Sequence, residues 1–455
     1  MFKKIEMWVL YLVVFFSILF AIGFGLLVRQ ELLGGTGSGK ITKTALFIVE
    51  LPVNLRKFFK GSEVDLFVED RFPNLDGFDG QPNSKESYLL LSRYDGDLKE
   101  GVVELVDLTT FEVLHTWNPD IDAFNDLVEK VDEFKYLNRD GNNKRSMLMH
   151  PKLTDNGALL FGWGKPLRKI DACSNLVFQN SHDIFHHSIE TDIDGNIWVP
   201  SHIYPQSLPI EKVGRDIISE DGFFDDAIVK LSPNGEILFE KSVSQIFIDN
   251  GLEYLLFSSG DLRFINDPIH LNDIQPVDFD GQYWKKGDVF LSLRHQSMVL
   301  LYRPSTNVIV WKGTGPFFHQ HDVNILDDHR ISIFDNNSKI FKKTRTVDGT
   351  NNIKIYNFRT KNYSTYLPNS LSEHNVKTPN QGRSTILKNG DLFIEESYFS
   401  RTLYFNVDGS LRWTHVNRAV NGKVYAVGWS RILYTDKDIQ TVNNFLSTKH
   451  NCNEI

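Results

Sequence analysis

The chain has 455 residues, of which 41% are hydrophobic and 24% are charged, a composition that is ordinary for a folded globular protein. Its formal net charge of −9 argues against a nucleic-acid partner, because no excess of basic residues is present to neutralise phosphates. Only two cysteines occur, Cys173 and Cys452, so no disulfide framework carries the fold. A single bridge between them in an oxidising compartment remains an alternative.

The N-terminal segment predicts a membrane anchor. The uncharged run from Met7 to Val28 is long enough to cross a bilayer as a helix, and it shows neither the shorter apolar core nor the small-x-small cleavage site of a signal peptide. Two lysines precede the run, whereas the arginine behind it is offset by a glutamate, which favours a cytoplasmic N-terminus. We therefore predict a single-pass inner-membrane protein, with its cytoplasmic N-terminus and transmembrane anchor in residues 1–28 and its body in the periplasm or on the exported side.

Residues 29–84 are predicted to form a linker and an amphipathic helix. The stretch GGTGSGKIT from Gly34 resembles a phosphate-binding loop, but Ile41 follows Lys40 where magnesium binding requires Ser or Thr, and no strand precedes it. A flexible Gly/Ser linker explains this stretch better. The next stretch, ITKTALFIVELPVNLRKFF, has apolar residues at helical spacing with basic residues opposite, which predicts an interfacial or propeller-capping helix.

From about Tyr88, short β-rich runs alternate with Asp-Gly, Asn-Gly and Asp-Asp turns, the usual signal of β-hairpins. Five segments align: LTDNGALLFG, DIDGNIWVPS, KKGDVFLSLR, LDDHRISIFDN and LKNGDLFIEES. Most of them are followed by a second hairpin, so each unit has four strands and repeats every ~40–60 residues. This pattern predicts an all-β fold, a six-bladed β-propeller over residues 85–435, followed by a C-terminal tail over residues 436–455.

The two ends of the repeat region indicate how the ring of blades closes. The first unit shows only three strands, and VYAVGWSRILY, from Val424 to Tyr434, is a strand without a unit of its own. Because open sheet edges invite aggregation, we expect this strand to complete the first blade as its innermost strand. Fourth strands often end in an aromatic residue, for which packing between blades is a better explanation than a cofactor role. These residues are Trp117, Phe178, Phe239, Trp311, Tyr366 and Trp413.

Histidines recur near the start of the innermost strands. His187 and His321 each lie seven residues before an aspartate of the turn that follows their strand. The spacing of His150 differs from this by one residue, and His270 precedes a longer strand. In a propeller these strand starts converge on the central channel, and functional residues cluster on the strand ends of rigid scaffolds. The repeated placement therefore predicts a shared pocket.

Three segments in this region resemble a known family. DPIHLND, then SLRHQSMVLLYRPSTNVIVWKGTGPFF, then QHDVNILDDHRISIFDNN are similar to segments of the bacterial arylsulfate sulfotransferases, and the likeness runs from about His150 to Trp413. Members of that family are periplasmic six-bladed propellers that move a sulfuryl group from a phenolic sulfate ester to another phenol without a nucleotide sulfate donor. The resemblance implies that this chain is a divergent, membrane-anchored arylsulfotransferase that needs no cofactor.

The resemblance also implies a catalytic set of three histidines and one arginine. By motif, the transiently sulfated histidine falls on His321, and the others fall on His270, Arg294 and His187, with the neighbouring His186 as a substitute for the last. Sulfuryl transfer has a loose transition state whose charge spreads over peripheral oxygens, and a planar, permanently charged guanidinium suits that charge. A neutral imidazole can attack the sulfur, and a second can protonate the departing phenolate.

Four residues are predicted to bind substrate: His186, His295, Phe318 and Trp198. The two aromatic side chains, with Phe317 and Tyr204, would line a phenol pocket, although such residues are more often part of a core. The expected partners are a small-molecule aryl sulfate and a phenol, together with the membrane through the N-terminal helix. A homodimer remains open.

Two other classes of function remain as alternatives. His319 and His321 share one face of a strand, and with His270 or His187 they would hold zinc or copper. We nevertheless predict no metal, because no cysteine or clear carboxylate partner accompanies them. The other alternative is a non-catalytic envelope propeller that serves as a binding or scaffold module, a role that needs no ring of histidines.

Overall fold

The computed structural model describes residues 6–32, 39–59, 66–209, 212, 222–258, 265–341, 344–448 and 452. The chain divides into two compact units, residues 1–65 and residues 66–455. The lysines before the apolar run, and residues 33–38 of the predicted Gly/Ser linker, lie outside the described residues.

The first unit consists of two helices, α1 (Met7–Leu32) and α2 (Gly39–Phe59). Within α1, the 24 residues Met7–Gln30 are long and apolar enough to cross a membrane, as the sequence predicts. Helices of this kind serve as membrane anchors or as signal sequences. The second helix covers the stretch that the sequence predicts as amphipathic, and it accommodates Pro52 in its interior.

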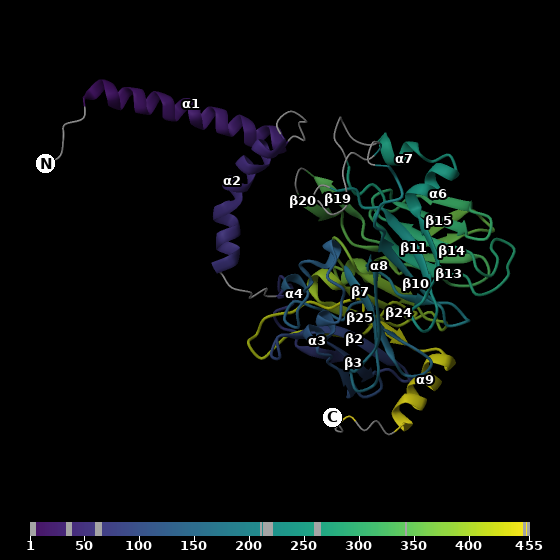
Figure 1. Cartoon of the computed structure of the whole chain (residues 1–455). Coiled ribbons are helices and arrows are strands. Elements are labelled where there is room, and N and C mark those ends of the chain that lie inside the picture. The colour runs from purple at the N-terminus through teal and green to yellow at the C-terminus, as the bar shows by residue number, and fades with distance from the viewer. Residues whose placement is uncertain are drawn as a thin grey trace. The chain divides into compact units, whose positions relative to one another are not determined.

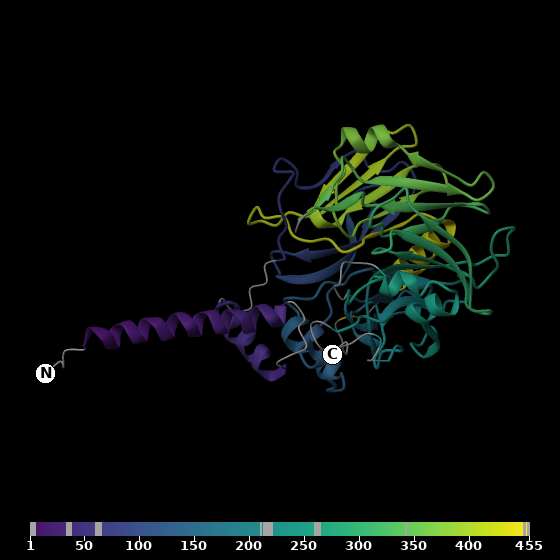
Figure 2. The same ribbon diagram turned by 90° about the horizontal axis from the view of Figure 1, so that it is seen from above.

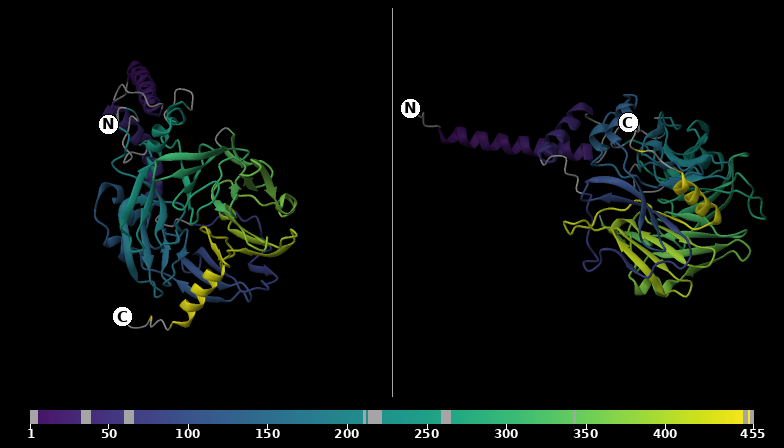
Figure 3. Two further views of the ribbon diagram at one scale, coloured as in Figure 1. Left: turned by 90° about the vertical axis from the view of Figure 1, so that its right-hand side faces the viewer. Right: turned by 90° about the horizontal axis from the view of Figure 1, so that it is seen from below.

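The second unit is a β-propeller, in which four-stranded antiparallel repeats are arranged around a central axis (Figure 3). Repeats one and two contain β27 (Arg431–Leu433), β2 (Tyr88–Asp95), β3 (Glu100–Asp107) and β4 (Val113–Trp117), then β5 (Lys152–Leu153), β6 (Leu159–Phe161), β7 (Lys165–Ile170) and β8 (Leu176–Phe185). Repeats three and four contain β9 (Glu190–Thr191), β10 (Ile197–His202), β11 (Asp226–Leu231) and β12 (Ile237–Ser242), then β13 (Leu271–Pro276), β14 (Val289–Leu293), β15 (Met298–Arg303) and β16 (Val308–Thr314). Repeats five and six contain β17 (Val323–Ile325), β18 (Arg330–Asp335), β21 (Asn352–Asn357) and β22 (Asn362–Tyr366), then β23 (Arg383–Ile386), β24 (Leu392–Glu396), β25 (Arg401–Phe405) and β26 (Leu411–Val416).

The predicted propeller class is confirmed, but the repeats do not form six separate sheets. Repeats two and three share one eight-stranded sheet. The cause is β8, which is 10 residues long and continues past its own repeat, so that Phe185 pairs with Ser201 of β10. A further two-stranded sheet, β19 (Ser338–Phe341) with β20 (Thr344–Val347), lies between β18 and β21 in the sequence.

Both ends of the second unit contribute to the closure of the ring. β27 pairs with β2, with Leu433 opposite Tyr88, which confirms that the strand-like segment near the C-terminus completes the first repeat. In addition β1 (Gly77–Gly80), which precedes the predicted propeller, pairs with β26 as a fifth strand of the last sheet. Gly80 has a φ of +120°, and a Cβ there would lie 2.4 Å from the Arg412 carbonyl oxygen, so only glycine fits this close approach.

Hydrophobic clusters join each repeat to the next, including the sixth to the first. The aromatic residues that the sequence predicts between blades lie in these clusters, one in each: Trp117, Phe178, Phe239, Trp311, Tyr366 and Trp413. Figure 2 shows the sheets of repeats five and six side by side. Because truncating a buried aromatic residue costs about 3–5 kcal/mol, these contacts hold the repeats in a fixed ring.

Short helices fill the connections between the repeats (Figure 1). They are α3 (Ile121–Asp126), η1 (Asp132–Phe134), α4 (Leu137–Asp140), α6 (Val243–Asp249), α7 (Tyr254–Phe257) and α8 (Pro368–Glu373), whereas η2 (Ser397–Phe399) lies within repeat six, between β24 and β25. The segment predicted as a C-terminal tail contains α9 (Asp436–Ser447), which starts with a capping box at Thr435 and buries Phe445 between repeats one and two. Beyond it, Cys452 forms a disulfide with Cys173, the bridge that the sequence leaves open.

Candidate functional site

One residue with a left-handed backbone precedes the innermost strand of every repeat. These six residues have φ between 53° and 60°, a backbone conformation that residues other than glycine rarely adopt. They are His150, His187, His270, His319, Gln381 and Trp429. The fold therefore repeats one tight turn around the axis and presents one side chain from each repeat at a similar level.

Four of the histidines form a cluster, which we call the histidine cluster: His150, His187, His270 and His321. The ring of His187 lies at its centre, with centroids 5.1 Å from His270, 6.4 Å from His321 and 6.4 Å from His150. Trp429 closes one side, 4.2 Å from the ring of His150 and 6.5 Å from that of His321. The predicted convergence of His187, His270 and His321 is thus present in the structure.

His186 points away from this cluster. Its Nδ1 lies 2.7 Å from Nδ1 of His187, while its Nε2 lies 3.3 Å from Oδ1 of Asp226. Because the ring of His187 contacts the other histidines of the cluster, His187 rather than His186 occupies the position that the sequence leaves undecided.

Arg294 lies beside the cluster and is only 4% exposed. Its Nη1 donates to Nε2 of His295 at 3.0 Å, and the ring of His295 stacks 4.5 Å from that of His270. Its Nε and Nη2 groups have no hydrogen-bond partner among the described residues. Burial, together with the positive charge of Arg345 on β20, lowers the pKa of Arg294 to about 10, so it remains a cation at neutral pH.

His270 is held by Asp267, three residues earlier, whose Oδ2 lies 2.5 Å from the histidine Nδ1. An ionised carboxylate only accepts hydrogen bonds, so Nδ1 carries the proton and Nε2 remains for proton exchange. Asp267 also fixes His295, whose Nδ1 donates to the Asp267 carbonyl oxygen at 2.6 Å. Asp267 was not among the residues predicted from the sequence, although it is the first residue of the segment DPIHLND.

Both ring nitrogens of His321 have partners. Nδ1 donates to Oδ1 of Asn336 at 2.6 Å, and Nε2 accepts the backbone N–H of Gln381 at 2.9 Å. The ring of His319 lies 6.3 Å from His295, and its Nδ1 donates to the Ser338 carbonyl oxygen. Among the described residues, the groups of potential ligand atoms that lie close enough to hold one metal ion do not include His319 or His321. The seven-residue spacing that His187 and His321 share does not mark the same backbone position, because the left-handed residue of repeat five is His319 and not His321.

Burial sets the protonation of three histidines of the cluster. It lowers the pKa of His150, His187 and His321 well below that of free histidine, and neighbouring charges add to this effect, with Arg294 next in importance for His321. Burial, followed by the neighbouring His270, also lowers the pKa of His295 to about 4. These imidazoles are neutral near pH 7, which leaves His321 with a free-base nitrogen at Nε2.

The two aromatic residues predicted to contact substrate have different surroundings. Trp198 is part of the hydrophobic core between repeats three and four, and its Nε1 donates to Oδ2 of Asp192. Phe318 is 45% exposed and lies under the ammonium of Lys339. The sequence does not distinguish these aromatic residues from Trp163, whose ring lies 4.8 Å from that of His187 and which the analysis missed.

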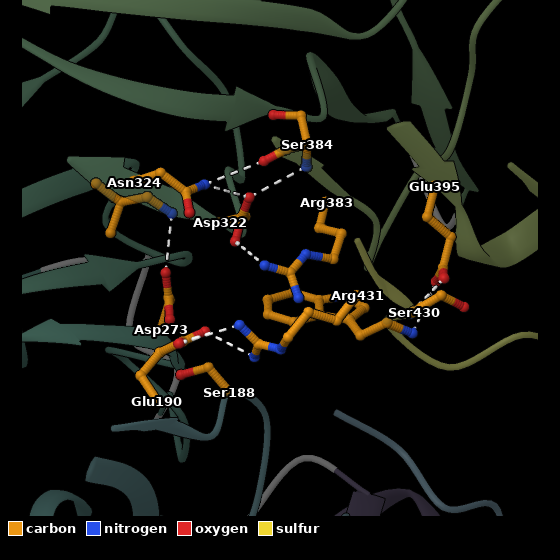
Figure 4. Close-up of polar contacts among 12 residues, drawn as sticks. Ser188, Glu190, Asp273, Asp322, Asn324, Arg383, Ser384, Glu395, Ser430 and Arg431 are labelled. Atoms are coloured by element: carbon orange, nitrogen blue, oxygen red, sulfur yellow. Dashed lines mark hydrogen bonds and ion pairs between the residues drawn. The ribbon is translucent and has the colours of Figure 1, made fainter. Parts of the chain in front are cut away.

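Figure 4 shows a group of buried ion pairs that involves Glu190, Arg431 and Arg383. Arg431 donates to both carboxylate oxygens of Glu190, at 2.8 and 3.1 Å, and a guanidinium nitrogen of Arg383 lies 3.7 Å from Asp322. The guanidinium of Arg383 is also 5.6 Å from the ring of Trp429, which places these pairs next to the cluster. They join the innermost strands of repeats one and three, and of repeats five and six.

Residues 150–418 match the family described as arylsulfotransferase (ASST), and this match covers more than half of the 455 residues. The chain belongs to the arylsulfotransferase family. The site borders a cavity of about 410 Å³, whose lining includes Trp163, Gln381 and Tyr398 together with the basic residues Arg145 and Lys165. Trp163 and Gln381 also contact the histidine cluster, so the cavity adjoins it.

Several solved structures are similar to this chain. A Bacteroides caccae protein of unknown function is 12% identical and has a TM-score of 0.44, with 76% of this chain and 98% of that chain covered. A streptogramin B lyase is 10% identical at a TM-score of 0.38, over 78% of this chain and 96% of its own. The WD40 β-propeller domain of Doa1 is 12% identical at a TM-score of 0.38, over 82% and 99%. Among curated proteins, none matches the sequence.

Proposed function

We propose that this arylsulfotransferase moves a sulfuryl group from an aryl sulfate ester to a phenolic acceptor through a sulfo-histidine at His321, without a nucleotide sulfate. The observation that carries the proposal is the buried guanidinium of Arg294, whose Nε and Nη2 groups have no partner among the described residues. Buried donors without a partner are costly, and two neighbouring N–H groups of a guanidinium match two oxygens of a sulfate.

In the first half of the reaction, Nε2 of His321 attacks the sulfur and the bond between sulfur and the aryl oxygen breaks. The departing phenolate takes the Nε2 proton of His270, which has to enter this step doubly protonated, with its Nδ1 proton held by Asp267 at 2.5 Å. In the second half, the acceptor phenol returns its proton to His270, its oxygen attacks the sulfur, and the sulfur–nitrogen bond breaks. Arg294 would stabilise the charge on the sulfuryl oxygens in both halves.

The attack requires His321 to exchange a hydrogen bond. Its Nε2 lone pair accepts the backbone N–H of Gln381, and that bond must break before the nitrogen reaches the sulfur. Gln381 has a φ of 55°, which costs a non-glycine residue of order 1 kcal/mol. A shift of this turn to an ordinary conformation would relieve that strain and free the nucleophile.

The donor and acceptor would enter through the cavity that borders the cluster, where Arg145 and Lys165 favour an anionic ester. We also propose that α1 anchors the chain in the inner membrane and that the propeller lies on the exported side. The disulfide between Cys173 and Cys452 supports this placement, because such bonds persist in oxidising compartments.

The direct test is to incubate the full-length protein with an aryl sulfate alone and to map the sulfated peptide by mass spectrometry. The label is expected on His321, and the first phenol should leave before the acceptor binds, which gives ping-pong kinetics. His321→Ala should abolish donor cleavage and transfer, whereas His319→Ala, the matched control, should retain turnover. Label on His319, or transfer that survives in His321→Ala, would refute the assignment.

A further inference from the structure

A second group of side chains lies directly behind His187. Nε2 of His186 is 3.3 Å and Nε2 of His202 is 3.4 Å from Oδ1 of Asp226, and the three ligand atoms lie within 4.8 Å of one another. The side chains of His186 and Asp226 are 5% and 0% exposed, and that of His202 is 19% exposed. Neither the sequence analysis nor the proposed sulfuryl transfer uses His202 or Asp226.

The polar atoms of this group have few partners outside the group. Apart from the contacts of 3.3 and 3.4 Å within it, neither the carboxylate oxygens of Asp226 nor Nε2 of His186 has a hydrogen-bond partner among the described residues, although these atoms are buried. Other histidine–carboxylate groups in the chain differ, since His270 with Asp267 and His329 with Asp328 both form hydrogen bonds of 2.5 Å. A buried carboxylate is costly unless a positive charge compensates it, and a bound cation would supply that charge.

The spacing fits a metal ion. Ligands at about 2.0–2.1 Å from a tetrahedral ion lie roughly 3.3–3.4 Å apart along each edge of the tetrahedron, which agrees with the two nitrogen–oxygen distances. Two imidazoles and one carboxylate are ligands that zinc-like ions accept, with a fourth position left for water.

Rigid strands hold the three ligands in place. His202 on β10 and Asp226 on β11 are directly opposed across an antiparallel pair. The backbone N–H of His186 donates to the carbonyl oxygen of Pro200 at 3.0 Å, which ties the third ligand to the same strand. The ring of Phe224 lies 5.0 Å from that of His202 and adds an apolar wall. The ligands are therefore preorganised by the sheet rather than by a loop.

We propose that His186, His202 and Asp226 bind one divalent transition-metal ion of the zinc class, and that this ion sets the proton on His187. A metal on Nε2 of His186 leaves the proton on its Nδ1, which lies 2.7 Å from Nδ1 of His187. His187 then accepts that proton in a hydrogen bond, and its own proton resides on Nε2. Nε2 of His187 can then donate a hydrogen bond to an anion. This role of His187 rests on the proposed function, whereas the metal site itself does not.

Metal binding is tested on the full-length protein in detergent, first stripped with a chelator and then titrated with Co²⁺ and Zn²⁺. One equivalent of Co²⁺ should bind with the intense visible absorption of a four-coordinate ion, and Zn²⁺ should displace it. The near-isosteric variants Asp226→Asn and His202→Gln should weaken Zn²⁺ binding by about 100-fold or more. His329→Gln, which removes a histidine from the hydrogen-bonded Asp328 group, is the matched control and should leave binding unchanged.

Absence of saturable binding by the wild-type protein, a six-coordinate cobalt spectrum, or equal affinity in Asp226→Asn would overturn the metal site. The wild-type titration decides the question even if a variant fails to fold. The effect on His187 is tested by calorimetric binding of inorganic sulfate, which should be about tenfold tighter to the zinc-loaded protein, the value of one hydrogen bond. Equal sulfate affinity would overturn that coupling. Neither titration uses aryl sulfate. The metal-binding and sulfate-binding results therefore do not depend on the outcome of the transferase assay.

Discussion

Replacement of Arg294 by lysine tests the anion clamp. Arg294 offers two N–H groups without a partner among the described residues, Nε and Nη2, and a hydrogen bond to a charged group contributes about 1.5–3 kcal/mol. Lysine keeps a positive charge but cannot present two donors in one plane, so Arg294→Lys should lose about one such bond in the transition state. The corresponding loss in kcat/KM is roughly 10- to 150-fold, and Arg294→Met, which removes both donors and the charge, should lose roughly 10²- to 10⁴-fold.

The assay follows release of a chromogenic phenol from its sulfate ester in the presence of a second phenol. Arg359→Lys is the matched control, since its side chain is 53% exposed and pairs with Asp328 at the surface. The control should leave kcat/KM unchanged. If Arg294→Lys retains kcat/KM within about twofold of the wild type, the bidentate clamp is wrong, because one charge-assisted bond is worth more than that.

Further predictions concern proton transfer, the buried ion pairs and acid stability. His270→Gln should slow transfer from unsubstituted phenyl sulfate more than from nitrophenyl sulfate, because only the more basic phenolate needs a proton; equal losses would contradict the role of His270. Glu190→Gln leaves Arg431 buried without its carboxylate, so unfolding in urea should show a loss of about 3–5 kcal/mol, and an unchanged midpoint would argue against the ion pair. Burial lowers the pKa of His186 to about 4, so the unfolded chain binds its proton first as the pH falls below 6.5. Stability should therefore be full above pH 6.5 and fall by about 1.4 kcal/mol per pH unit for each such imidazole below it, and urea midpoints that agree at pH 7.5 and 5.5 would exclude this effect.

Local signals located much of the candidate site before the fold was known. The histidines that precede the innermost strands are visible as a repeat, and their convergence follows from propeller geometry. The seven-residue spacing shared by His187 and His321 does not follow the backbone, because β17 and the segment before it are longer than their counterparts at β9. Trp198 and Trp163 show why aromatic contacts could not be assigned, since one lies in a core and the other beside His187.

The sequence by itself determined the class of fold, the apolar helix at Met7–Gln30, and the closing strand near the C-terminus, because these depend on short-range periodicity and on the number of strands. Only the tertiary structure decided which polar groups meet. Asp226 is 24 residues from His202 along the chain and 40 from His186, and their meeting depends on the register of β10 and β11. The unpaired donors of Arg294 likewise have no sequence signal, because a missing partner is a property of the packed interior.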